Sequence, residues 1–227
     1  EARASLGRQG PLYDITASFL EAEIGHGRRH AVGYGFPNDR ALRVVERLGL
    51  YRWVDEVVEL TWPAAPWAAS VATAVDLAGL DDADPVWNAL DSRWAEMAAA
   101  LGDSVLGVRD AAWLQWRYRD RPDAAHELLL RPSGPACRAG GAAVVRCHAD
   151  LLECLDLIGD PAAWPHLLRE VRHRAAVLGR PTVRAWITAS HESLLRHEGD
   201  GAARAALNLH VPANAYTEGI PPESLHG

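Results

Sequence analysis

Two glycines and two arginines near the start of the chain form the pattern best suited to chemistry. Arg3, Gly7, Arg8 and Gly10 lie in a short stretch that runs into Pro11. Glycines let the backbone approach a ligand closely, and the N–H groups at the start of a helix favour an anion, to which arginine adds positive charge. The stretch predicts a phosphate-binding loop, and a plain helix start with no ligand is the alternative.

This loop does not match two common phosphate-binding motifs. It lacks the Gly-Lys-Ser/Thr ending of a Walker A loop and the Gly-x-Gly-x-x-Gly spacing of dinucleotide-binding folds. The chain has 23 basic residues other than histidine, and all of them are arginine. Chemistry that needs a lysine amine, such as Schiff-base formation, is therefore excluded.

Apolar periodicity indicates the elements that position this loop. The spacing predicts a helix that starts at Pro11, where a proline is well tolerated, and ends at Gly25 and Gly27. A short strand is expected at His30–Phe36. Together, loop, helix and strand form the beginning of an α/β unit.

A second helix and strand complete this unit. Asn38 is the expected N-cap of a helix over residues 41–48, and Gly49 is its expected C-terminal stop. Tyr51–Trp62 then alternates as a strand of a β-ribbon.

The rest of the chain repeats this order of elements. Both halves contain a helix, a Gly/Arg turn, a strand, a second helix, a glycine and a strand, which indicates one α/β unit used twice. The expected elements are, in order, a linker at Pro63–Asp84, helices at Pro85–Leu101 and around Trp113–Tyr118, strands at Glu127–Arg131, Ala142–His148 and Leu151–Ile158, a helix at Trp164–Leu178, a strand at Thr182–Ile187, a short helix at His191–His197 and a strand at Arg204–His210.

The two units differ where the loop meets the helix. In the second unit, Gly159, Asp160 and Pro161 stand at this position. Asp160 suits a helix N-cap, but its carboxylate would repel a diphosphate, and proline has no N–H to offer. We therefore expect anion binding in the first unit alone.

Residues Tyr34-Gly35-Phe36-Pro37-Asn38, with Ala41 and Gly49, resemble the last part of a GNAT acetyltransferase domain. In that family a glycine loop that binds the coenzyme is followed by a helix and then a strand. After the strand comes the motif N-x-x-A-x-x-x-Y, and then a glycine. The resemblance implies an α/β (α+β) fold, a GNAT-like mixed sheet flanked by helices in two related units, with acetyl-CoA as co-substrate. The coenzyme-binding residues that it implies are Arg3, Leu6, Gly7, Arg8, Gln9, Gly10 and Asn38.

The same resemblance implies a division into domains. Residues 1–62 would be the C-terminal part of a GNAT acyltransferase domain, 63–84 a linker, and 85–227 a second, degenerate GNAT-like domain. A GNAT domain needs several strands before its coenzyme loop, and none precedes Glu1. We therefore expect the chain to be fragmentary at both ends.

The catalytic groups of the family are not all matched. The tyrosine that would protonate the leaving thiolate falls on Val45, which cannot donate a proton. Tyr51, Tyr34 and Glu46 are weak replacements, and Tyr51 is expected to pack in the sheet. The catalytic acid and the general base therefore stay unknown.

Other polar residues give no further site. Asp55, Glu56 and Glu59 alternate with apolar residues and are expected to form a solvated strand face. The 10 histidines form no ligand pair, and the 3 cysteines form neither a disulfide framework nor a zinc motif. No metal site is predicted.

Composition limits the partners. The net charge of −7 argues against nucleic-acid or membrane-surface binding, and no apolar run or signal peptide indicates a membrane span. We expect a cytoplasmic protein whose partners are an acyl-CoA and a small-molecule or peptide amine. The predicted activity is transfer of an acetyl group to an unknown amine; the alternatives are an inactive GNAT-fold binding or regulatory module and an unrelated α/β domain.

Overall fold

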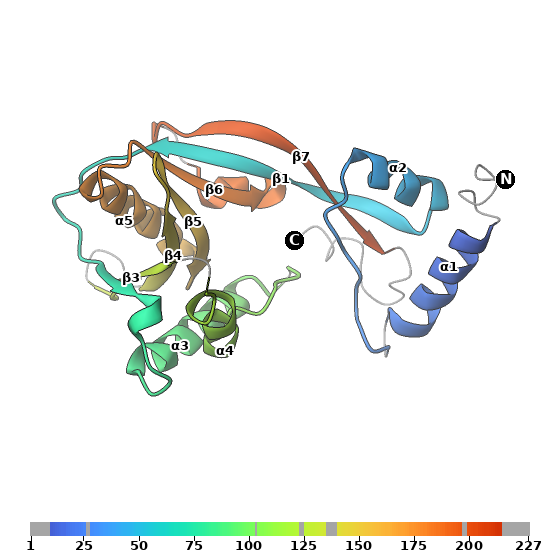
Figure 1. The fold of residues 1–227 in the computed structure, drawn as a ribbon, viewed down its shortest axis with the longest axis horizontal. Helices are drawn as coiled ribbons and strands as arrows, with labels where there is room; N and C mark the ends of the chain where they lie inside the picture. The colour runs from blue at the N-terminus through green and yellow to red at the C-terminus, as the bar shows by residue number, and fades with distance from the viewer. Residues whose placement is uncertain are drawn as a thin grey trace.

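The computed structural model of the chain describes residues 10–25, 28–102, 104–122, 125–134, 140–196 and 199–214. Its helices are α1 (Pro11–Glu23), α2 (Asp39–Leu48), α3 (Pro85–Ala100), α4 (Ala111–Leu114) and α5 (Trp164–Val177), with short helical turns η2 (Leu77–Gly79), η3 (Gln115–Arg119), η4 (Pro161–Ala163) and η5 (Ala189–Leu194). Its strands are β1 (Tyr51–Pro63), β2 (Thr73–Asp76), β3 (Glu127–Arg131), β4 (Gly141–Cys147), β5 (Leu151–Ile158), β6 (Thr182–Thr188) and β7 (Ala203–Asn214). Figure 1 shows their arrangement.

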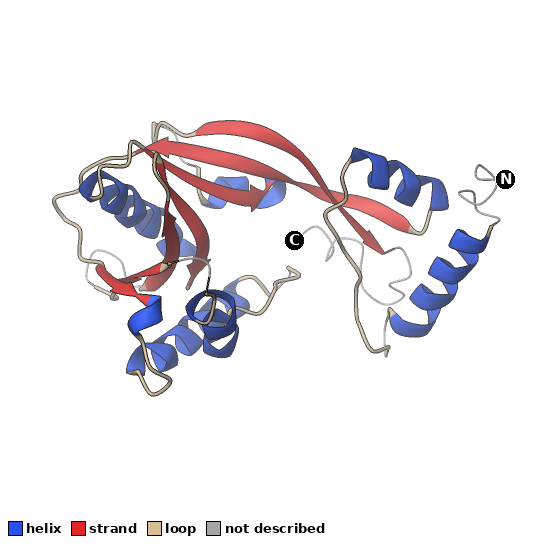
Figure 2. Cartoon of the chain, in the orientation of Figure 1, coloured by secondary structure: helices blue, strands red, loops and turns tan. Residues whose placement is uncertain are grey.

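In the described part of the chain, seven strands form one sheet in the order β2-β3-β4-β5-β6-β1-β7. Neighbouring strands run antiparallel except for the parallel pair β5 and β6. Helices flank the sheet, as Figure 2 shows. The predicted fold class, a mixed sheet flanked by helices, is confirmed.

β1 connects the early part of the chain with the later part. It lies between β6 and β7, so a strand expected at the end of the first unit is an inner strand of a sheet built mostly from later residues. The stretch 63–84, expected to be a linker, contains the edge strand β2, which pairs with β3.

The long strands β1 and β7 form a ribbon that extends out to α1 and α2 (Figure 1). Only the later half of β1, from Val57, also pairs with β6. At the far end of the ribbon, Leu20 of α1 packs with Leu48 and Leu50 in a small buried cluster. The ribbon and this cluster therefore hold α1 and α2 at one end of the molecule.

Two larger apolar clusters cover the opposite faces of the sheet. One contains residues of α5, such as Leu167, and the other contains residues of α3 and α4, such as Leu90. The neighbours Val144 and Val145 on β4 enter different clusters, because successive side chains of a strand point to opposite faces. The core is thus a sheet packed between helices.

The expected caps of α2 are present. Asn38 Oδ1 accepts a hydrogen bond from the Ala41 N–H at 3.0 Å, and Gly49 has a φ of 67° at the C-cap. Glycine adopts this left-handed conformation without the strain that a Cβ would cause. The sequence therefore determines the two ends of α2 locally.

The strand expected at His30–Phe36 is not formed. In the described structure only His30 and Tyr34 make isolated bridges there, to Ile24 and Ala213 respectively. A strand requires a partner along its length, and among the described residues this stretch has only those two bridges. The segment therefore runs as an extended connection. No helix in the described ranges is both long and apolar enough to cross a membrane.

Candidate functional site

The parallel strands β5 and β6 pair over only part of their length. Their pairing runs from Leu151↔Thr182 to Cys154↔Ala185, and both strands then continue without pairing to each other. A cavity of about 150 Å³ adjoins the unpaired stretch and is lined by residues of both strands, including Leu157. Between the two strands, the backbone groups of this stretch do not hydrogen-bond to each other. A ligand of the second unit could bind here.

The helix start beside this cavity offers poor conditions for an anion. The Ala162 N–H donates to Asp160 Oδ1 at 2.8 Å, and the Ala163 N–H donates to the Asp160 carbonyl at 2.8 Å. The Trp164 N–H donates to the Pro161 carbonyl, and Pro161 itself has no N–H. These three N–H groups are already hydrogen-bonded within the turn, and the Asp160 carboxylate accepts one of the bonds. Both features disfavour a diphosphate.

Trp164 is one of the residues that line this cavity. Its Nε1 donates to the Gly159 carbonyl at 3.0 Å, and the ring is buried in the α5 cluster. Gly159 has a φ of 125°, and a Cβ placed on it would lie 2.9 Å from the Gly140 carbonyl oxygen. The glycine in this loop thus serves close backbone packing within the protein.

The start of α1 differs from that of α5. Gly10 is the N-cap, Pro11 follows it, and no side chain in the described part of the chain caps the helix. The predicted site residues Arg3, Leu6, Gly7, Arg8 and Gln9 lie outside the described residues. Of the predicted loop, the structure therefore describes only Gly10, the N-cap of α1.

Asn38, the other predicted coenzyme residue, caps α2 through its side chain. Val45, at the family's tyrosine position, lies half-buried on the same helix. The weak candidate Tyr51 packs against the α1–α2 cluster, and burial raises the pKa of its phenol above the usual 10. Tyr51 is therefore a poor proton donor, as expected from its place in the sheet.

Tyr34, the second candidate for the catalytic acid, lines an apolar pocket. The pocket has a volume of about 280 Å³. Tyr34 and Phe36 come from the connection after α1, Val211 from β7, Ile187 from β6, and Val105 from the loop after α3. Pockets with apolar walls and a few polar groups are typical of small-molecule sites. The resemblance to GNAT domains did not predict this pocket, because its walls come from distant segments.

A hydrogen-bonded chain of polar side chains lies at the edge of this pocket. Ser190 Oγ donates to Asp55 Oδ2 at 2.6 Å, and His191 Nδ1 lies 2.9 Å from Ser190 Oγ and 3.1 Å from Thr188 Oγ1. His191 Nε2 lies 3.5 Å from Ser104 Oγ. His191 and Thr188 both line the pocket.

The expectation that Asp55 faces solvent is wrong. Its side chain is buried, with the residue only 8% exposed, and it also accepts the Glu56 N–H at 2.7 Å. The pairing register of β1 and β7 shifts between Trp53 and Asp55. Such a bulge interrupts the regular alternation on which the expectation was based. His191 is the other residue of this hydrogen-bonded chain that the sequence did not indicate, since the histidines form no ligand pair.

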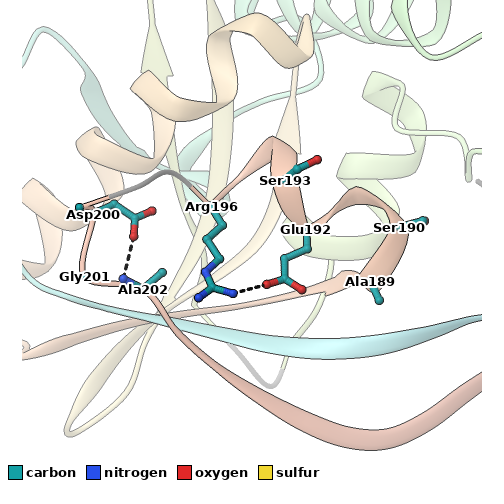
Figure 3. A pocket seen from close by; sticks show the side chains of 9 residues that line it. Ala189, Ser190, Glu192, Ser193, Arg196, Asp200, Gly201 and Ala202 are labelled. Atoms are coloured by element: carbon teal, nitrogen blue, oxygen red, sulfur yellow. Dashed lines mark hydrogen bonds and ion pairs between the residues drawn. The ribbon is translucent and has the colours of Figure 1, made fainter.

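An open, polar hollow is lined by residues of η5 and of the stretch before β7, and it does not resemble a coenzyme site. Figure 3 shows Ser190 and Asp200 at opposite sides of the view, with Glu192 and Arg196 between them. Glu192 accepts from Arg196 at 2.7 Å and from Arg204 at 2.8 Å. Burial acts to raise the pKa of Glu192, but these two hydrogen bonds lower it overall. The Glu192 and Arg196 charges in the hollow are thus already neutralised in ion pairs.

The mixed sheet, with its partly paired parallel strands, has the fold of the GNAT N-acetyltransferases. A comparison with family models gives no match, and a search of curated proteins gives none either. Solved structures do match this fold.

Three of these structures illustrate the likeness. A protein of unknown function from Enterococcus faecalis, described as a probable N-acyltransferase, matches with a TM-score of 0.58 and 14% identity, over 89% of this chain and 48% of that chain. A GCN5-related N-acetyltransferase from Anabaena variabilis gives 0.54 and 11%, over 89% and 48%. One from Kribbella flavida gives 0.50 and 13%, over 89% and 46%.

The likeness establishes the fold alone, because sequence identities this low carry no information about individual site residues. The chain spans about half the length of these solved structures. The activity of a whole protein of this kind is therefore a matter for proposal and experiment.

Proposed function

We propose that the chain belongs to an acyl-CoA-dependent N-acetyltransferase, with acetyl-CoA bound in the first unit. The acceptor is an amine on a small molecule or peptide. The second unit is degenerate and contributes to the acceptor side. The contrast between the two helix starts carries this proposal: three amides are used and a carboxylate is present before α5, whereas α1 begins at Gly10 with no side-chain cap in the described structure.

The chemistry proposed is direct transfer. The amine attacks the thioester carbonyl, and backbone N–H groups stabilise the oxyanion. Positioning of the two reactants supplies much of the acceleration. Val45 cannot act as an acid, so the leaving thiolate takes its proton from water or another group.

Turnover by the full-length protein tests this proposal. Acetyl-CoA and a panel of primary amines would be incubated with the protein, and release of the free thiol would be measured. We expect thiol release that depends on the amine, and its loss in Gly10→Glu, which places a bulky anion at the start of α1. Gly79→Glu is the matched control, because Gly79 is exposed and a Cβ there meets nothing within 4 Å.

Two results would count against the proposal. Full activity in Gly10→Glu would place the coenzyme elsewhere. Acetyl-CoA binding without turnover across the panel would instead favour a GNAT-fold binding or regulatory module, a function with which Val45 is compatible.

A further inference from the structure

The walls of the apolar pocket select for an apolar ligand. Tyr34 and Phe36 are each more than half exposed and contact each other edge to face, with ring centroids 6.1 Å apart. Ile187 and Val105 contribute aliphatic surface. The volume of about 280 Å³ lies just below the usual range of small-molecule sites, about 300–1,000 Å³. The pocket therefore suits a small aliphatic or aromatic group.

The charge around the pocket argues against a polycation. Among the described residues that line it, none is acidic, and Arg109 carries the positive charge. Arg109 Nε donates to Asp156 at 2.7 Å, and its guanidinium lies 4.4 Å from the centroid of the Trp113 ring. The Arg109 charge is already paired with Asp156 and no carboxylate lines the pocket, so a ligand with several positive charges would find no anionic partner among the described lining residues.

The hydrogen bonds at the pocket edge determine which nitrogen of His191 carries the proton. Asp55, as a carboxylate, can only accept, so the single proton of Ser190 Oγ is used in the bond to Asp55. Ser190 Oγ can then only accept from His191 Nδ1, 2.9 Å away. Two lone pairs at that distance would repel, so Nδ1 bears the proton in the neutral ring.

The other ring nitrogen is left as a proton acceptor. Nε2 has Ser104 Oγ at 3.5 Å as its neighbour, a distance at which a hydrogen bond is weak. His191 itself lines the pocket. A ligand nitrogen in the pocket could therefore replace this weak contact.

We propose that this pocket binds the acceptor, a primary amine on a small apolar body, and that His191 Nε2 is the general base. Asp55 and Ser190 are positioning residues, because they act on the substrate only through the ring of His191. This inference rests on the proposed function for the acetyl-CoA co-substrate.

The reaction follows ordinary thioester chemistry. The free amine nitrogen attacks the carbonyl carbon of acetyl-CoA and the C–N bond forms. The surplus proton on nitrogen passes to His191 Nε2. The C–S bond then breaks, the thiolate leaves with the electron pair and takes a proton from water, and His191 returns its proton to water.

Two sets of measurements on the full-length protein test this inference. In the first, turnover of acetyl-CoA with 2-phenylethylamine is compared with turnover with spermidine. We expect 2-phenylethylamine to be the better substrate, and His191→Gln to lower its kcat by about 10²–10⁴-fold without changing acetyl-CoA affinity. Ser193→Ala, an exposed change on the same short helix, is the control and should keep full activity.

The second measurement separates a positioning role from a structural one. ¹⁵N NMR of histidine-labelled protein should show His191 as the Nδ1–H tautomer, and addition of 2-phenylethylamine should shift the Nε2 resonance. Ser190→Ala should mix the tautomers and lower kcat while leaving the folded spectrum intact.

Several outcomes would overturn the inference. They are full activity in His191→Gln, an Nε2–H tautomer, a preference for spermidine, or no response of Nε2 to 2-phenylethylamine. Failure of acetyl-CoA to bind would overturn the proposed function instead. The amine titration, which needs no coenzyme, would still decide whether the pocket binds an apolar amine.

Discussion

Glu153 on β5 accepts hydrogen bonds from three basic side chains at the centre of the sheet. His148 Nε2 lies 3.0 Å from its carboxylate, Arg146 Nη2 lies 2.6 Å from it, and Arg184 Nη2 lies 3.0 Å from it. The Glu153 side chain is only 12% exposed. Replacing it by Gln would remove the charge that these partners share.

The size of the effect follows from the pKa of this carboxyl. Burial acts to raise the pKa, but the hydrogen bonds from His148, Arg146 and Arg184 lower it from the usual 4.5 to about 2. Each pKa unit corresponds to 1.36 kcal/mol, which makes about 3 kcal/mol an upper limit. The partners are about a third exposed, so we expect solvent screening to reduce the loss in Glu153→Gln to about 2 kcal/mol.

The pH dependence has a defined sign. A carboxyl whose pKa is depressed by folding binds fewer protons in the folded than in the unfolded chain. Its stabilisation is therefore complete above about pH 4.5 and is lost as the pH falls toward 2. At neutral pH, about 2 kcal/mol corresponds to a lower Tm by about 4–8 °C for a protein of this size.

Thermal unfolding followed by circular dichroism between pH 7 and pH 3 would measure this effect. Glu96→Gln is the matched control, because Glu96 pairs with Arg93 on the surface and its side chain is 44% exposed. That change should cost no more than about 0.5 kcal/mol. A Tm difference between wild type and Glu153→Gln that is absent at pH 7, or that does not shrink on acidification, would refute the reasoning.

Two further predictions concern single residues. Chemical denaturation of Gly159→Ala should show a loss of stability of about 1–3 kcal/mol, since φ is 125° and the new Cβ would lie 2.9 Å from the Gly140 carbonyl oxygen. Gly79→Ala, whose new Cβ meets nothing within 4 Å, should be close to neutral in the same assay. Val45→Ala should cost about 0.5–1.5 kcal/mol as a loss of packing and should leave kcat nearly unchanged. A large loss of kcat in a folded Val45→Ala protein would show that this position takes part in catalysis.

Local signals in the sequence predicted many elements well. The strand at Leu151–Ile158 has the predicted limits, and Asn38 and Gly49 cap α2 as expected. These features depend on neighbouring residues: alternation along a strand, a side chain that accepts a nearby N–H, and a glycine at a left-handed position. Such features need no knowledge of the rest of the fold.

Long-range pairing was out of reach of this reasoning. The insertion of β1 between β6 and β7 and the edge strand β2 depend on partners far away in the sequence. The candidate base His191 also depends on long-range pairing. Its neighbour Ser190 is hydrogen-bonded to Asp55, which lies far away in the sequence and past a bulge in β1. A histidine that follows a serine carries no such signal in the sequence.

Native mass spectrometry of the full-length protein with saturating acetyl-CoA tests the central claim most directly. We predict one coenzyme per chain, lost in Gly10→Glu and retained in Asp160→Ala, because Asp160 only caps the turn before α5. Two coenzymes per chain, or one that survives Gly10→Glu and is lost on a change at Asp160, would show that the second unit holds the site.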